Sequence, residues 1–189
     1  MKLLHIGVVL LTGLLAAGTS RAADTYKLDV SHSTVAFSIS HLVISEVDGR
    51  FNEFDGAVKL EGNTLVAAEA TIQAKSVDTG NSKRDDHLRN TDFFDVEKFP
   101  TITFVSKRVE DGKIIGDFTL HGVTKEVALP YTIKGPIKDP WGKTRIGIKA
   151  EATLSRKDYG LTWNKVLEAG GVTVGDEVKI RISAEAVKE

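Results

Sequence analysis

The sequence predicts an all-β domain of about eight strands. After residue 22, apolar and polar residues alternate with a period of two along most of the chain, which is typical of strands with one buried face. Residues 76–101 are the one long stretch that breaks the alternation, and they indicate a short helix and a loop. A closed up-and-down barrel and a two-sheet sandwich both fit this pattern. We favour the barrel, because one helix interrupts an otherwise regular succession of strands.

Residues 1–22 are typical of a secretory signal peptide. Lys2 gives a positive start, residues 6–17 are apolar, and Ser20 and Ala22 are small residues before a cut. The apolar run is shorter than the about 20 residues that a membrane span needs. We therefore expect a Sec-type signal peptide, export to the periplasm, and one mature domain at residues 23–189.

Composition excludes several function classes. The chain has no cysteine, which excludes disulfides, thiolate metal sites and a lipid-modified cysteine. Its formal net charge of −1 gives no basic footprint, so we expect no nucleic-acid partner. Neither a membrane anchor nor an amphipathic helix follows the leader, so we expect transient membrane contact at most.

The predicted strands follow one another with turn signals between them. Alternation runs through residues 35–41, 65–74, 102–104, 114–120, 127–133, 146–150 and 178–184. Dipeptides that contain glycine or proline indicate the turns. They are Asp48-Gly49, Asp55-Gly56, Gly62-Asn63, Asp111-Gly112, His121-Gly122, Gly135-Pro136, Asp139-Pro140 and Gly175-Asp176. Inward residues of such a barrel either interlock into a solid core or leave a channel, and the pattern does not decide between them.

The interrupting stretch predicts a surface helix at about 81–89. Asn81 or Ser82 can cap its first turn. We expect Phe93, Phe94 and Phe99 to fasten the loop that follows to an apolar surface.

Several separated blocks of the sequence resemble the YceI-like family of exported lipocalin-like proteins. They cover nearly the whole mature chain, in the family's order, at residues 26–29, 32–33, 35–42, 47–51, 87–89, 92–95, 99–104, 116–125 and 174–178. The resemblance implies an extended antiparallel eight-stranded lipocalin-like barrel that holds a polyisoprenoid, such as an isoprenoid quinone or its precursor, in an apolar channel. It also implies a homodimer, a role in envelope stress, and no shared catalytic residues or cofactor.

Within that resemblance, the ligand-binding candidates are apolar residues of alternating strands and two polar residues of the helix. The apolar set is Val35, Phe37, Ile39, Ile102, Phe104, Phe118, Leu120, Tyr131, Ile133 and Ile148. His87 and Arg89 are the candidates for a polar head group. An ordinary solid core explains the apolar set equally well, and a solvated helix face explains the charged residues.

Two alternatives to a lipid carrier stay open. A structural or partner-binding envelope protein would have a filled core. An enzyme would need an acid and a base, for instance His121 and Asp117, and no G-x-S-x-G turn is present. The spacing of the histidines matches no metal motif, so we expect no metal. Trp141 and Trp163 would seal the channel or serve a dimer surface.

Overall fold

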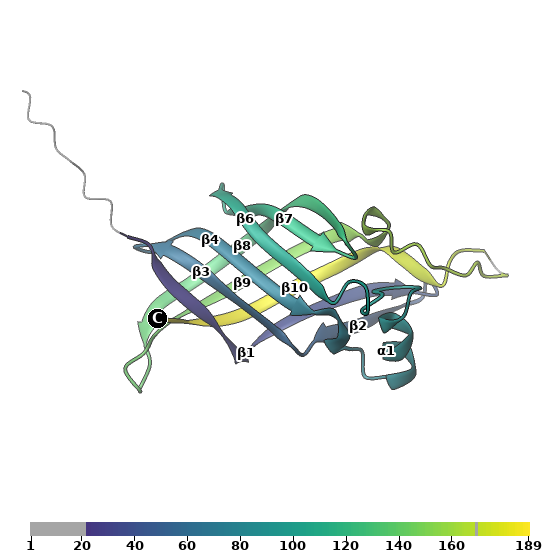
Figure 1. Cartoon of the computed structure of the whole chain (residues 1–189), viewed down its shortest axis with the longest axis horizontal. Helices are drawn as coiled ribbons and strands as arrows, with labels where there is room; N and C mark the ends of the chain where they lie inside the picture. Colours follow the sequence, from purple (N-terminus) through teal and green to yellow (C-terminus); the bar gives the residue numbers. More distant parts are fainter. Residues whose placement is uncertain (1–21, 169) are drawn as a thin grey trace, which may run out of the picture.

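Ten strands and one α-helix make up the part of the chain that the structure describes, residues 22–168 and 170–189 of a computed structural model (Figure 1). The predicted signal peptide, residues 1–22, lies outside the described residues except for Ala22. The elements are β1 (Asp24–His41), β2 (Ser45–Phe51), β3 (Phe54–Glu61), β4 (Thr64–Gln73), β5 (Val77–Asp78), α1 (Ser82–Arg89), β6 (Thr101–Glu110), β7 (Lys113–Leu120), β8 (Val123–Lys138), β9 (Thr144–Ser155) and β10 (Val174–Lys188). None of the described helices has the length and apolar character that crossing a membrane requires.

Eight of the strands close into an antiparallel barrel. The ring runs β1, β3, β4, β6, β7, β8, β9 and β10, and β10 returns to β1 along most of its length. Tyr26 lies opposite Lys188 at one end of this seam, and Phe37 lies opposite Ile180 towards the other. The predicted eight-stranded barrel is confirmed, and the sandwich is excluded because one continuous sheet closes on itself.

β1 is long enough to serve two partners on its other side. Its first residues pair with β3, and Val35–His41 pair with β2. β5 pairs in turn with β2. These two extra strands extend the sheet beyond the ring at one end of the barrel, beside α1 (Figure 1).

Four of the eight predicted turns lie inside strands. Asp48-Gly49 belongs to β2, Asp55-Gly56 to β3, Gly135-Pro136 to β8 and Gly175-Asp176 to β10. In two of them packing requires the glycine. A Cβ at Gly49 would overlap the ring of Phe37, and a Cβ at Gly56 would clash with the backbone carbonyl of Glu69. Glycine inside a strand marks such close approaches. The turn predictions at these four places were therefore wrong.

The interrupting stretch forms the predicted helix and crossing loop, but it also contains the short strand β5, which the sequence did not predict. Asn81 caps α1, because its Oδ1 accepts a hydrogen bond of 3.1 Å from the backbone N–H of Arg84. Phe93 is buried, Phe94 packs edge-on against Phe51 with centroids 5.7 Å apart, and Phe99 packs against His121 at 4.5 Å. The three phenylalanines fasten the crossing loop to the barrel.

The interior of the barrel is solid in one half. A single buried cluster fills the half where the two ends of the described chain meet, and its members are Tyr26, Val58, Leu60, Leu65, Phe104, Ile114, Leu129, Ile146, Ile148, Ala150 and Ala186. In the other half, next to α1, two smaller clusters pack against the walls. One centres on Phe51 and Ile102, the other on Phe93 and Tyr159. The space between these clusters is the candidate site.

Candidate functional site

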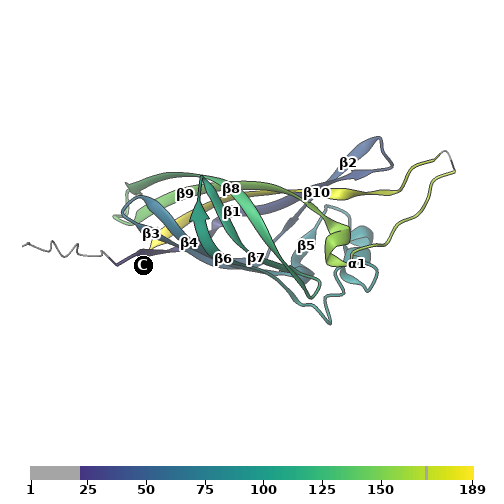
Figure 2. The same cartoon turned by 90° about the horizontal axis from the view of Figure 1, so that it is seen from above.

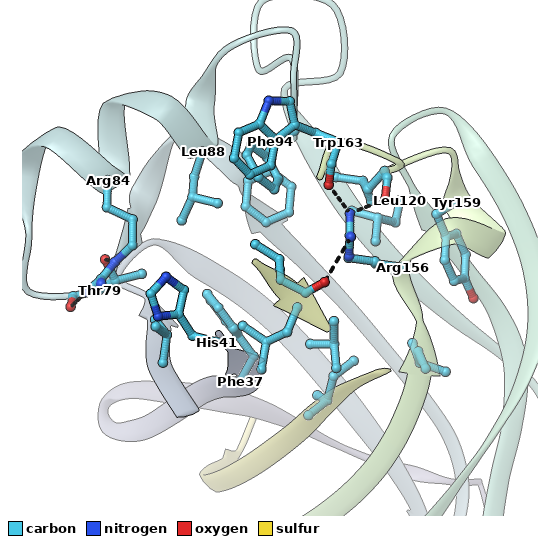
Figure 3. Close-up of a pocket in the computed structure, with 18 of the residues that line it drawn as sticks. Phe37, His41, Thr79, Arg84, Leu88, Phe94, Leu120, Arg156, Tyr159 and Trp163 are labelled. Atoms are coloured by element: carbon cyan, nitrogen blue, oxygen red, sulfur yellow. Dashed lines mark hydrogen bonds between the residues drawn. The ribbon is translucent and has the colours of Figure 1, made fainter. Parts of the chain in front are cut away.

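A cavity of about 250 Å³ occupies the half of the barrel that adjoins α1 (Figure 3). Strands β1, β7 and β10 present alternate side chains to it, as a strand does to one face of a sheet. Phe37 and Ile39 come from β1, Phe118 and Leu120 from β7, and Val178 and Ile180 from β10. Leu88 of α1, Phe94 of the crossing loop and Trp163 close it from the side away from the sheet. The cavity wall is therefore mainly apolar and in part aromatic.

Polar side chains gather at one side of the cavity, where Arg84, Thr79 and His41 lie together (Figure 3). Arg84 donates from Nε to Thr79 Oγ1 at 2.7 Å and from Nη2 to the Thr79 carbonyl at 2.8 Å. Thr79 is fixed in turn, since its Oγ1 donates to the buried carboxylate of Asp85 at 2.6 Å. The guanidinium of Arg84 is thus held in place at the cavity wall.

A second arginine, Arg156, holds the wall on the opposite side. Its side chain is 5% exposed and donates from Nε to the Gly175 carbonyl at 2.8 Å. It also donates from Nη1 to the carbonyls of Leu161 at 2.6 Å and Trp163 at 2.9 Å (Figure 3). Burial lowers the pKa of Arg156 from its ordinary value, and Asp176, 3.5 Å away, opposes that shift. These bonds fasten the segment after β9, residues 156–163, to the start of β10.

His87 joins α1 to that segment across the cavity. Its Nε2 lies 2.8 Å from Asp92 Oδ2, and its ring stands edge-on to Phe93 at 5.0 Å and to Trp163 at 4.9 Å. Phe93 and Trp163 also contact each other, with centroids 5.2 Å apart. The rings of His87, Phe93 and Trp163, together with the Asp92 carboxylate, close this side of the cavity.

The structure brings half of the predicted ligand-binding residues together. The six that line the cavity are Phe37, Ile39, Ile102, Phe118, Leu120 and His87. The other six lie elsewhere. Phe104 and Ile148 belong to the solid core, Tyr131 and Ile133 pack against it, and Val35 packs beside Phe51.

Arg89, the last of the six, is bound within the protein. It donates from Nε to the Lys75 carbonyl at 2.8 Å, from Nη2 to the Val77 carbonyl at 2.9 Å, and from Nη1 to Asp86 at 2.9 Å. Contact of all twelve residues with a ligand stays a prediction.

Sequence reasoning ranked Arg84 of the charged helix below Arg89 and His87 for a head-group contact, and it missed Arg156, Tyr159 and Leu161 as cavity residues. A signal for the first was present: Arg84 and Leu88 are spaced four apart, and His87 lies between them three residues after Arg84, so all three share a helix face from which Arg89 is turned away. No comparable signal marks Arg156, because its partners are backbone carbonyls supplied by distant residues.

One group of side chains has the spacing of a metal site within residues 22–168 and 170–189, formed by Asp29, His32 and Glu185. A cation already lies among them, because Arg145 Nη1 is 2.6 Å from Asp29 Oδ2 and 3.5 Å from Glu185 Oε2. The guanidinium neutralises the carboxylates, and we assign no metal to the group.

Comparison with known proteins agrees with the barrel fold. Residues 26–186 match the YceI-like domain family. The chain belongs to the YceI-like family. Within the family, a UPF0312 protein of Staphylococcus aureus strain MSSA476 is 39% identical over 163 residues, which cover 85% of this chain and 95% of the relative.

Solved YceI-like structures have the same fold. A YceI protein of Campylobacter jejuni is 31% identical, with a TM-score of 0.69, covering 79% of this chain and 90% of that one. BcnA of Burkholderia cenocepacia is 22% identical, with a TM-score of 0.72, covering 84% and 98%. A polyisoprenoid-binding domain of Saccharophagus degradans is 17% identical, with a TM-score of 0.69, covering 87% and 98%. The last two likenesses show the fold alone.

Proposed function

We propose that this YceI-like protein is a carrier or store for an isoprenoid lipid, such as an isoprenoid quinone or its precursor, and that the cavity takes the lipid tail. One observation carries the proposal: the barrel is solid in one half and hollow in the other, and the hollow half has a mainly apolar wall. The Saccharophagus degradans domain, described as polyisoprenoid-binding, shares the fold and supports the ligand class.

The size of the cavity limits how much of the tail is held. Small-molecule sites usually have volumes of about 300–1,000 Å³, so 250 Å³ suits a segment of an isoprenoid and not a long chain. About ten buried carbons would contribute roughly 8 kcal/mol, against an association cost of about 4–15 kcal/mol. Tail burial alone therefore gives weak binding, and polar contacts to the head group are needed for tight binding.

Arg84 is our candidate for the head-group contact, in place of Arg89. It lies at the cavity wall beside Thr79 and His41, whereas the Arg89 guanidinium is taken up by two backbone carbonyls and Asp86. A guanidinium donates well to a quinone carbonyl or to a phosphate oxygen. The polar side of the cavity thus supports a ligand with an oxygen-bearing head.

The setting in the cell is part of the proposal. The signal-like residues 1–22 support export to the periplasm. We also propose a role in the envelope, including its stress response, and a homodimer, as the resemblance to the YceI-like family implies. Sedimentation of the mature chain would decide the oligomeric state.

The two alternatives have less support. A structural protein with a filled barrel does not need the hollow half. The acid and base suggested for an enzyme have separate partners: His121 Nδ1 lies 3.2 Å from the Tyr159 carbonyl, and Asp117 pairs with Lys107 at 2.6 Å.

Mass spectrometry of an organic extract tests the proposal. The mature protein would be purified from its native envelope without detergent and extracted. We expect an isoprenoid in a fixed ratio to protein, whose mass gives the tail length and head group. An empty extract, from a protein that also takes up no added prenyl quinone, would overturn the proposal in favour of the structural alternative.

A further inference from the structure

Two loops project past α1 at the cavity end of the barrel (Figure 2). One is the turn between β1 and β2, with Val43 and Ile44 at its tip, and the other is the hairpin-like loop before β10, with Val166 and Val172. Val43 is 67% exposed, Ile44 85% and Val166 83%. We call these four residues the apolar tip. Exposed apolar side chains gathered at one place mark interaction sites.

The two loops form one unit. The Leu42 N–H donates to the Thr173 carbonyl at 2.9 Å, and the side chain of Val43 lies against Gly171. The second loop is also bonded within itself, from Thr173 N–H to the Lys165 carbonyl at 2.9 Å. Its base is fixed by Arg156, which is bonded to the carbonyls of residues 161, 163 and 175. The apolar tip is therefore presented by a connected framework.

The backbone of the first loop is strained at two consecutive residues. Leu42 has a φ of 53° and Val43 a φ of 64°, in the left-handed region that a β-branched residue rarely adopts. Such conformations cost about 1–3 kcal/mol each and concentrate at functional places. Val43 and the residue after it, Ile44, are both exposed.

We propose that the apolar tip inserts into the surface of a lipid bilayer and sets the mouth of the cavity against it. This inference rests on the proposed function, since a lipid carrier must exchange its ligand with a membrane. His41, at which the first loop begins, and Thr173, at which the second loop ends, line the cavity themselves. A tail that leaves the cavity between them meets the same surface that receives the tip.

The shape and charge of the tip favour a bilayer over a second protein chain. A stable protein interface uses about 20–30 residues on each side, and four side chains on two projecting loops fall far short of that. Residues 42–45 carry no charge, and residues 164–173 carry one of each sign, Lys165 and Glu168. Attraction to the membrane therefore comes from apolar insertion, at the depth of the head-group boundary, and has little dependence on salt.

Vesicle sedimentation with matched variants tests the inference. The mature protein, the double variant Ile44→Ser/Val166→Ser and the control Trp141→Ser would be mixed with phosphatidylcholine vesicles. Trp141 is 81% exposed and lies in the turn between β8 and β9, at the opposite end of the barrel (Figure 1). We expect the double variant to partition at least tenfold more weakly than the wild type, and the control to stay within twofold of it.

Three results would overturn the inference: equal partitioning of wild type and double variant, an equal loss in the control, or a double variant whose oligomeric state has changed. Titration with a prenyl quinone, without vesicles, separates the inference from the proposed function. The double variant should bind the quinone as the wild type does, and a loss there would show that the loops shape the cavity and are not a membrane contact. A wild type that binds vesicles but no quinone would contradict the carrier function and leave the docking surface standing.

Discussion

The buried guanidinium of Arg156 donates a hydrogen bond of 2.9 Å to the backbone carbonyl of Trp163, whose ring packs against His87 of α1. The side of the cavity away from the sheet is thereby closed by a segment that has little regular structure of its own. In a sheet, a neighbouring strand donates hydrogen bonds to the backbone carbonyls. Here the Arg156 side chain donates them instead, to carbonyl groups that would otherwise be buried without a partner.

We expect Arg156→Met to lower the free energy of unfolding by about 3 kcal/mol, because three backbone carbonyls lose a charged donor. Urea denaturation measures this loss. Amide hydrogen exchange should show faster opening of residues 160–173. The matched control is Arg181→Met, which removes a half-exposed pair with Asp48 and should cost about 1 kcal/mol or less. Equal effects of the two changes would contradict the role given to Arg156.

A bulky side chain placed in the cavity should prevent ligand binding. Val178 of β10 lines the cavity, so we expect Val178→Trp to place its ring in the space for the tail and to reduce bound isoprenoid at least tenfold. Val105→Trp is the control, because Val105 is 55% exposed on β6 and outside the cavity. Mass spectrometry of extracts from both proteins makes the comparison. Full occupancy in Val178→Trp would place the ligand elsewhere.

We expect Phe118 to form the floor of the cavity. It packs against the solid core and against both smaller clusters, with its ring edge-on to Tyr159 at 5.5 Å. We expect Phe118→Ala to deepen the cavity and to shift the bound tails towards greater length, at a cost of about 3 kcal/mol in stability. Phe118→Leu should give a smaller shift in the same direction. Unchanged tail lengths in the extracts of both variants would show that another residue forms the floor.

Asp29 should make the barrel sensitive to acid. Hydrogen bonds from Ser31, then from Arg145 and His32, hold the pKa of Asp29 well below its usual range. Because folding lowers this pKa, the ionised Asp29 carboxylate stabilises the folded state. Its contribution is complete above the unfolded-state pKa of about 4 and is lost as the pH falls further.

Denaturant titrations from pH 6 down to pH 2 measure this effect. We expect Asp29→Asn to be less stable than the wild type near neutral pH, and the difference to shrink below about pH 4. Asp55→Asn is the control, since its pair with Lys27 has both side chains more than half exposed. A difference for Asp29→Asn that stays constant over the range would rule out this linkage.

Period-two alternation predicted the closed barrel, because each strand must bury one face whatever its neighbours are. The turn signals failed at Gly49 and Gly56, which resemble turn residues but lie inside strands and are required by packing against Phe37 and Glu69. That requirement comes from residues on other strands, and the sequence around each glycine does not predict those contacts.

The division of the barrel into a solid and a hollow half was also beyond the sequence. Phe104 and Phe37 have the same pattern in their strands, yet Phe104 lies in the solid core and Phe37 in the cavity wall. The difference depends on which side chains face them across the barrel. For Arg84 and Arg89, by contrast, the helical spacing already separates the two, because Arg84 shares a face of α1 with His87 and Leu88 and Arg89 does not.

The solid half of the barrel has a kinetic consequence. With the core blocking one end, the tail of the proposed ligand would enter and leave by the same mouth, so the carbons that entered first would leave last. Each buried methylene adds about 0.8 kcal/mol, which lengthens the dwell time about fourfold if the departure barrier rises by that amount. Dwell time then grows with tail length until the tail reaches Phe118, and further carbons add nothing. Among lipids with a common head group, the barrel would release short tails quickly and retain equally all those that reach its floor.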